Sequence, residues 1–491
     1  MEGITMAVDS KQARDPNEVL LIRMVDDARD EIVKLCSDLI KIDSVNYGKH
    51  IYNSMNPIFD FVKSVFEKEG IPYQEFKCPF PEPVNGQTVY YPNLVASLQG
   101  QKSDRGKTLM FCGHLDVVPY YRDAWDPAID PIGGLIKDGV LYGRGATDMK
   151  SGCACMIMAM VLLKRSGIPF NGVLKNYNIP DEESNSEYGA QFMTREHLDA
   201  INADAIIIGE STSAGPELGP VIVLGEKGMQ WFKLTFYGAS GHGSMPKPKS
   251  NVINKANRII QALPKIKFKQ GIAPVSKFQM LKMLVKRLGF KKLIKMMFES
   301  AERPIYDEDG NDISIFFKTT VSVNMINAGK KENLIPSNGE LVLDIRVLPG
   351  VDTNDIFMSL SDLARKLGCR IQFPAGFHQQ SLSSKLQKRP IDIKVDIINS
   401  ELGNFSPADH EIVKIFDKSF EEFYGIHSIH FFAPGSTDGT HLRKYGLNTY
   451  VFGPGNGQTA HSENESIEID DIIKATKVYL ISAYRYLKNG K

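Results

Sequence analysis

A histidine and an aspartate stand two residues apart in the short run from Gly113 to Pro119. The run reads G-H-L-D-V-V-P and follows the apolar segment 107–112, which predicts a strand. Side chains two residues apart on extended chain point to the same side. His114 could therefore bind a metal while Asp116 orients its ring from behind, although a lone histidine is more often structural.

Two further acidic segments carry candidate ligands. Asp148 is the one carboxylate in the glycine-rich run of residues 141–152. It fits either a helix cap or a carboxylate that offers one oxygen to each of two metal ions. Asp181, Glu182 and Glu183 follow the strand-like segment 172–179. A solvated acidic loop is the commoner reading of such a run, but one glutamate could bind a metal while its neighbour accepts a proton from water.

Glu210 and His461 complete the set of candidate ligands. Glu210 ends the apolar run I-I-I-G-E, and His461 lies in a glycine-rich segment after another strand-like stretch. Open α/β sheets place their sites at the carboxyl ends of strands. A set of nitrogen and oxygen ligands without cysteine suits zinc, cobalt or manganese. A shared aspartate would imply two ions roughly 3.5–4 Å apart.

The elements that must position these residues alternate between strands and helices. Expected strands at 91–98, 107–112, 172–179 and 205–208 are interleaved with expected helices at 26–43, 55–70 and 152–166. This alternation indicates an α/β sheet with helices on both faces. It resumes after residue 375, with helices at 410–424 and 470–487 and a strand at 449–452.

A different pattern occupies the middle of the chain. We expect a strand at 229–237, a helix at 251–263, strands at 318–326 and 340–347, a helix at 353–367 and a strand at 370–373. This β-α-β-β-α-β order is that of a ferredoxin-like sandwich. The sequence therefore predicts a discontinuous domain, 1–224 and 374–491, interrupted by a domain at 225–373 with a helical insertion near 265–316.

Composition excludes several classes of protein. The chain has 491 residues with 58 basic and 58 acidic side chains, and 42% of its residues are hydrophobic. These values exclude collagen, disordered chains and disulfide scaffolds, and zero net charge argues against a nucleic-acid binder. The six cysteines suggest reduced thiols, and the sequence shows neither a secretory signal nor an apolar run long enough to span a membrane. We therefore expect a cytoplasmic enzyme.

The insertion carries two weaker patterns. Residues 265–300 are rich in lysine interleaved with apolar residues. Such a segment could contact a membrane surface or a partner groove, but we favour a helix packed on its own domain or on another subunit. Residues 306–312 resemble the start of a calcium loop but lack the glutamate at the twelfth position, which favours a solvated turn.

These motifs together resemble the M20 metallopeptidase family over most of the chain, from about residue 26 to residue 487. The resemblance rests on G-H-x-D-V-V-P, Y-G-R-G-x-x-D-M-K, D-E-E, G-E and A-H-S-E-N. It implies a zinc-peptidase-like catalytic domain with a mixed sheet and flanking helices, and an inserted ferredoxin-like lid that forms dimers. One ion would bind His114, Asp148 and Glu210, and the other Asp148, Glu183 and His461. Asp116 would orient His114, and Glu182 would be the general base.

The resemblance also assigns residues to substrate binding. His242, in Y-G-A-S-G-H-G-S-M-P, would stabilise the oxyanion, and it can reach the site of a partner subunit. Asn333 and Arg346 would hold the α-carboxylate of a small-molecule substrate. Gly435 and Asp438, in G-S-T-D-G, resemble the substrate-side loop of the family.

The implied activity is hydrolysis of the amide bond of an N-acyl amino acid or small peptide by a metal-activated water. Dipeptidase or carboxypeptidase cleavage uses the same chemistry and remains an alternative. Deamination or decarbamoylation of a non-peptide molecule is a second one, because divergent members of such folds change chemistry through their loops. A non-catalytic binding protein on the same fold would be expected to lack ligands, whereas all five ligand positions and the base are present.

Overall fold

The computed structural model describes residues 14–48, 51–102, 106–213, 219–271, 283, 286, 318–377, 390–433 and 435–488. Its contacts divide the chain into two compact units. The first comprises residues 1–222, 408–429 and 445–491, and the second comprises residues 223–407 and 430–444. The second unit thus extends beyond the predicted domain at 225–373, whose bounds stay a prediction.

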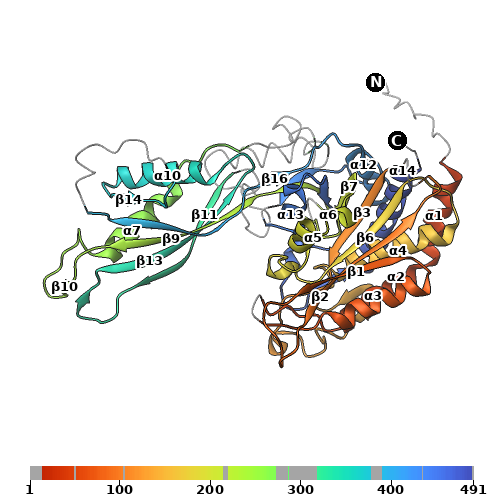
Figure 1. Cartoon of the computed structure of the whole chain (residues 1–491), viewed down its shortest axis with the longest axis horizontal. Helices are drawn as coiled ribbons and strands as arrows, with labels where there is room; N and C mark the ends of the chain where they lie inside the picture. Colours follow the sequence, from red (N-terminus) through yellow and green to blue (C-terminus); the bar gives the residue numbers. More distant parts are fainter. Residues whose placement is uncertain are drawn as a thin grey trace, which may run out of the picture. The chain divides into compact units, whose positions relative to one another are not determined.

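The first unit contains a mixed sheet (Figure 1). Its strands follow the order β1-β2-β6-β3-β7-β18. β1 and β2 are antiparallel, as are β2 and β6, whereas β6, β3, β7 and β18 run parallel to one another. The bounds are β1 Tyr73–Pro79, β2 Tyr90–Gln99, β3 Thr108–His114, β6 Val173–Ile179, β7 Ala205–Ile208 and β18 Thr449–Val451. Because four parallel strands end at one edge, the residues that follow them meet there.

Helices lie on both sides of this sheet in Figure 1. The central one, α4 (Lys150–Ser166), is buried almost all round because its sequence is apolar and small on every face. It packs against α14 (Ile469–Leu487) and α2 (Arg29–Lys41). The other helices of the unit are α1 Pro16–Asp27, α3 Asn56–Lys68, α5 Ala190–Glu196, α6 Leu198–Ile201 and α12 Glu411–Tyr424.

A small antiparallel sheet completes the first unit. It joins β4 (Leu135–Lys137), β5 (Val140–Tyr142) and β19 (Ser466–Glu468) in the order β19-β5-β4. The pairing sets Tyr142 opposite Ser466, although these residues lie far apart in sequence. This pairing brings the segment after β5 next to the segment before β19.

The second unit contains a five-stranded sheet of order β11-β13-β9-β15-β14. Its first four strands are antiparallel neighbours, and β9 alternates between buried and half-buried residues, as a strand with one covered face does. Helices α7 and α10 cover one face and share an apolar core with the sheet. The bounds are β9 Gly228–Tyr237, α7 Val252–Ala262, β11 Thr320–Ala328, β13 Asn338–Val347, α10 Thr353–Lys366, β14 Ile371–Gln372 and β15 Ile393–Ser400.

The order of these strands confirms the ferredoxin-like class but corrects one of its elements. The segment 370–373 was expected to supply the last strand, yet β14 covers only two residues and lies at the edge beside β15. β15 pairs with β9 along most of its length and is the fourth strand of the motif. The two-residue β14 is too short to cover β9.

Shorter elements of the second unit carry candidate residues. β8 (Ile222–Glu226), which begins at the boundary, pairs with β16 (Asn404–Phe405) and β17 (His430–Ala433), and α13 spans Asp438–Lys444. β10 (Gly241–His242) pairs with β12 (Leu334–Ile335). Apart from residues 283 and 286, the basic segment beyond residue 271 and the calcium-like run 306–312 lie outside the described residues.

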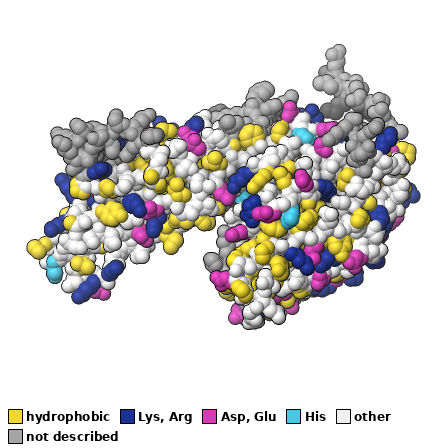
Figure 2. All heavy atoms as spheres, in the orientation of Figure 1, with side chains coloured by type: hydrophobic (Ala, Val, Ile, Leu, Met, Phe, Trp, Pro, Cys, Tyr) yellow, Lys and Arg dark blue, Asp and Glu magenta, His cyan; other side chains and the backbone are white. Residues whose placement is uncertain are grey.

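Basic and acidic side chains are interspersed on the face of the molecule shown in Figure 2. Among the helices that the structure describes, none combines the length and the apolar character needed to cross a membrane.

Candidate metal centre

The predicted ligands meet at the carboxyl edge of the parallel strands in the first unit. His114 is the last residue of β3, and Glu210 follows β7 by two residues. Glu182 and Glu183 form a short turn directly after β6. His461 lies in the segment between β18 and β19, and Asp148 lies between β5 and α4. The strand-end prediction of the sequence is thus reproduced by the topology.

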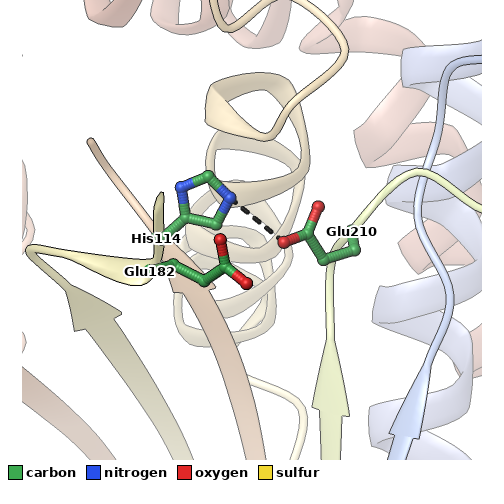
Figure 3. Close-up of side chains that lie close together, drawn as sticks. All are labelled: His114, Glu182 and Glu210. Carbon is green, nitrogen blue, oxygen red and sulfur yellow. Dashed lines mark ion pairs between the residues drawn. The ribbon is translucent and has the colours of Figure 1, made fainter. Parts of the chain in front are cut away.

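One group of donors is centred on the imidazole of His114. Its Nε2 lies 3.0 Å from Asp148 Oδ1 and 3.0 Å from Glu210 Oε1. Its Nδ1 lies 2.9 Å from the backbone oxygen of Asp116, which fixes the ring, and the side chain is completely buried. Figure 3 shows the side chains of Glu182 and Glu210 approaching the ring of His114 from β6 and β7. One imidazole and three carboxylates thus converge on this part of the site.

A second group is centred on His461. Its Nε2 lies 3.1 Å from Asp148 Oδ2 and 3.2 Å from Glu183 Oε2. His461 has a φ of 63°, in the left-handed region that few residues other than glycine adopt. Because Oδ1 of Asp148 lies beside His114 and Oδ2 lies beside His461, this carboxylate turns one oxygen toward each imidazole.

The ionisation of these groups reflects crowded buried charge. Burial, together with the charge of Asp148, raises the pKa of Glu210 to about 8 and also raises the pKa of Glu183. Hydrogen bonds to Asp148 and Glu183 raise the pKa of His461 to about 10. Burial opposes protonation of His114, but the charge of Glu210 and hydrogen bonds to carboxylates outweigh it and raise its pKa. These raised pKa values mean that the groups bind protons more readily when no cation offsets the negative charge of the site.

The donor set fits divalent cations. The described residues contain two groups whose possible ligand atoms lie within 4.8 Å of one another: His114 with Glu182 and Glu210, and His114 with Asp148 and Glu183. Imidazole nitrogens and carboxylate oxygens suit zinc, cobalt and manganese. Several acidic groups in one buried place are stable only when cations neutralise them or when they take up protons.

Asp116 is buried behind the ligands and has more contacts than its predicted role requires. Its Oδ1 lies 3.4 Å from Nδ1 of His114, and it accepts hydrogen bonds from the backbone N–H groups of Glu182 and Glu183, both at 3.1 Å. Asn46 Nδ2 donates a fourth contact at 2.8 Å. One carboxylate thus fixes the histidine and the turn that carries both glutamates.

Glycines let the backbone pack closely beneath Glu210. A Cβ atom at Gly152 would lie 2.1 Å from the backbone oxygen of Gly209, and a Cβ atom at Gly453 would meet the same oxygen at 2.1 Å. Real side chains do not tolerate such distances. The start of α4 and the end of β18 can therefore approach the end of β7 only because both positions are glycine.

The candidate substrate residues lie in the second unit. The exposed His242 lies on β10, and the backbone oxygen of Asn333 accepts a 2.8 Å hydrogen bond from Gly243, so the small β10–β12 pair brings His242 and Asn333 together. Arg346 on β13 forms a bidentate pair with Asp344 of the same strand, at 2.9 and 3.1 Å.

The G-S-T-D-G segment is held from below by a residue that no sequence motif pointed to. Glu226 is completely buried and accepts hydrogen bonds from the backbone N–H and the hydroxyl of Thr437, at 3.1 and 2.6 Å. Gly435 lies two residues before Thr437, and the buried Asp438 follows it and begins α13. The order of this loop therefore depends on a carboxylate from β8.

Sequence reasoning missed the residues that support the ligands. Asn46 follows a helix without any motif, so no local signal marks it. Arg144 lies inside the Y-G-R-G motif and Glu465 directly after A-H-S-E-N, so their places beside the motifs were a usable signal. The two side chains form a buried ion pair, with Arg144 Nη1 2.6 Å from Glu465 Oε2.

Comparisons with known proteins show the family of this chain. A family model described as peptidase family M20/M25/M40 matches residues 110–484. An uncharacterized metallohydrolase of Methanococcus maripaludis is 28% identical over 457 residues, which cover 92% of this chain and 98% of that one. A succinyl-diaminopimelate desuccinylase of Methylobacterium radiotolerans is 34% identical over 238 residues, which cover 48% of this chain and 56% of that one.

A solved structure shares the fold. Human carnosine dipeptidase 1 superposes with a TM-score of 0.67 at 17% identity, with 96% of this chain and 99% of that chain covered. This agreement concerns the architecture alone. The match of the family model over residues 110–484 confirms the resemblance that the motifs predicted. This chain belongs to peptidase family M20/M25/M40 and is a metallohydrolase.

Proposed function

We propose that this metallohydrolase binds two divalent ions and cleaves the amide bond of an N-acyl amino acid or small peptide. The observation that carries the proposal is the placement of Asp148, whose two oxygens lie 3.0 Å from His114 Nε2 and 3.1 Å from His461 Nε2. One ion would bind His114, Asp148 and Glu210, and the other Asp148, Glu183 and His461. Zinc is the first choice for this donor set, with cobalt and manganese as alternatives.

Proton transfer would be carried out by Glu182, on the short turn after β6. When bound, the two ions would polarise the scissile carbonyl and lower the pKa of the attacking water. Glu182 would take a proton from that water at its carboxylate and pass it to the leaving amine. Its carboxylate lies in one group with the ligand atoms of His114 and Glu210, which supports this role. Asp116 holds both Glu182 and His114 in place.

Residues 225–373 would act as a lid that binds the substrate. His242 would stabilise the oxyanion, while Asn333 and Arg346 would hold the α-carboxylate of the substrate, with Gly435 and Asp438 on the substrate side. The bidentate pair of Arg346 with Asp344 supports this assignment, because it fixes the guanidinium on β13. Residues 1–224 and 374–491 would form the catalytic domain.

We also propose that the lid forms a homodimer through β11. This strand lies at the edge of its sheet, and among the described residues no strand pairs with its outer side. Met325 and Ile326 on it are 66% and 57% exposed. An open edge with large apolar side chains favours pairing with a second copy. All six cysteines are buried and none of them forms a disulfide, which supports a reducing compartment such as the cytoplasm.

The substrate class is tested with the purified enzyme loaded with zinc or with cobalt. A panel of N-succinyl and N-acetyl amino acids, dipeptides and N-carbamoyl compounds is assayed for kcat/KM. We expect the highest values for N-acyl amino acids, and the relation to a desuccinylase supports including the succinyl group. A preference for dipeptides or carbamoyl compounds would replace the substrate class. Absence of turnover with two ions bound would favour a binding protein.

A further inference from the structure

A buried ion pair lies beside the metal centre and takes no part in the proposed chemistry. Arg144 Nη1 lies 2.6 Å from Glu465 Oε2, and the two side chains are 4% and 0% exposed. Arg144 follows β5 and Glu465 precedes β19. The pairing of these strands continues into a 2.9 Å hydrogen bond from the N–H of Gly143 to the backbone oxygen of Glu465. The small sheet therefore brings the two charges together.

The carboxylate of Glu465 also binds the segment that ends in Asp148. Oε1 accepts hydrogen bonds from the backbone N–H groups of Thr147 at 2.8 Å and Asp148 at 2.9 Å. Oε2 accepts one from Gly145 at 3.2 Å in addition to the contact with Arg144. Both oxygens are thus used to fix residues 145–148, and with them the carboxylate that faces both imidazoles.

The guanidinium of Arg144 reaches the other ligand segment. Its Nη2 donates to the backbone oxygen of His461 at 3.3 Å. The ring of Trp125 lies 5.5 Å from the guanidinium carbon, and Asn464 accepts a 2.8 Å hydrogen bond from the N–H of Asp126. The pair thus touches the backbone of Asp148 on one side and of His461 on the other.

We propose that Arg144 and Glu465 form a positioning pair that sets the affinity of the ion bound by Asp148, Glu183 and His461. Two of its three ligands are held through this pair, whereas His114 and Glu210 come directly from the ends of β3 and β7. Groups that orient ligands commonly change metal affinity when they are removed. The inference rests on the proposed two-ion site.

The test measures zinc binding to the metal-free protein by calorimetry, and cobalt binding by visible absorption. Wild type should bind two ions. In Glu465→Gln one of the two affinities should fall by about 10–100-fold, the range typical of groups behind metal ligands, and the other should change less. Glu465→Gln keeps the shape of the side chain and one acceptor oxygen, which preserves folding better than Glu465→Ala does.

Arg144→Lys provides an independent variant. Lysine keeps the charge but cannot bridge Glu465 and the backbone of His461 with a planar fork. The affinity for the same ion should therefore fall, by less than in Glu465→Gln. In both variants excess zinc should restore kcat, because the catalytic groups are intact.

A matched control separates positioning from general stabilisation. Glu18 and Arg485 form another buried pair in the same unit, with Arg485 Nη2 2.6 Å from Glu18 Oε2 and side chains 8% and 9% exposed. Glu18→Gln should lower the melting temperature but leave both zinc affinities and the cobalt spectrum as in wild type.

The outcomes distinguish this inference from the proposed function. The positioning role would be overturned if Glu465→Gln bound both zinc ions as tightly as wild type does. It would also be overturned if Glu465→Gln and Glu18→Gln lost the same amount of zinc affinity. Equal weakening of both ions in Glu465→Gln would also contradict it. A wild-type protein that binds fewer than two ions would instead contradict the two-ion site itself.

Discussion

Glu182 and Glu183 are neighbours on one turn, yet the site gives them different surroundings. Both carboxylates are grouped with His114, but that of Glu183 also groups with Asp148 and lies 3.2 Å from His461 Nε2, whereas that of Glu182 groups with Glu210. Their backbone N–H groups bind opposite oxygens of Asp116. Asp116 thus fixes the backbone of both glutamates, and the different partners of their carboxylates support one ligand and one base.

This difference can be tested with the same change at both positions. Glu182→Gln should retain both ions and lose about 10²–10⁴-fold in kcat, the usual contribution of a general base. Glu183→Gln should lose one ion, because the amide is a poorer ligand. Metal content after dialysis and kcat at saturating substrate measure the two effects. A Glu182→Gln enzyme with kcat near wild type would exclude the assigned base.

At the scale of elements, the short strands matter as much as the long ones. β5 and β19 cover three residues each, but their register places Tyr142 opposite Ser466 and so sets the segments that carry Asp148 and His461 side by side. The long strand β11 lies at the edge of its sheet, and its outer side pairs with no strand among the described residues.

The edge of β11 predicts how the protein assembles. If β11 forms the proposed homodimer, Met325→Lys combined with Ile326→Lys should convert it into monomers, since two charges would be buried at the contact. The mass in solution, from sedimentation velocity or light scattering, measures this. Leu20→Lys is the matched control, because Leu20 is an apolar residue of α1 with 43% exposure. A monomeric wild type, or a variant that stays dimeric, would contradict the proposed interface.

At the scale of the whole molecule, the metal centre joins parts of the chain that are distant in sequence. Its candidate ligands range from His114 to His461, and the charge of five carboxylates is gathered around two imidazoles. Bound ions would therefore offset buried repulsion and link two of the three sequence segments of the first unit, 1–222 and 445–491. Binding to the folded state alone raises the free energy of unfolding.

Metal removal should consequently destabilise the enzyme. At zinc concentrations of 100 times the Kd, one bound ion adds about 2.7 kcal/mol to the free energy of unfolding. A chelator should lower the melting temperature of wild type, and added zinc should restore it. His461→Ala, which removes a ligand of one ion only, should show a smaller shift. If zinc-loaded wild type melts at the same temperature with and without chelator, the ions do not stabilise the fold.

Much of the fold follows from local patterns. Continuous apolar runs indicate the buried parallel strands β3 and β7, and alternation indicates β9. The sequence pattern does not mark β15 and predicts the last strand of the ferredoxin-like motif at 370–373 instead, a segment that forms only the two-residue β14. Which strand borders β9 depends on pairing between distant segments, and this pairing has no local periodic signal.

The sequence by itself determined the family, the α/β class and the candidate ligands, because residue type and spacing carry the chemistry of each motif. Only the tertiary structure decided that Asp148 turns one oxygen to each histidine and that Asn46 and Glu465 stand behind the ligands. These contacts join residues up to 317 positions apart. Their distances depend on strand register and on helix packing across the sheet, which no single segment encodes.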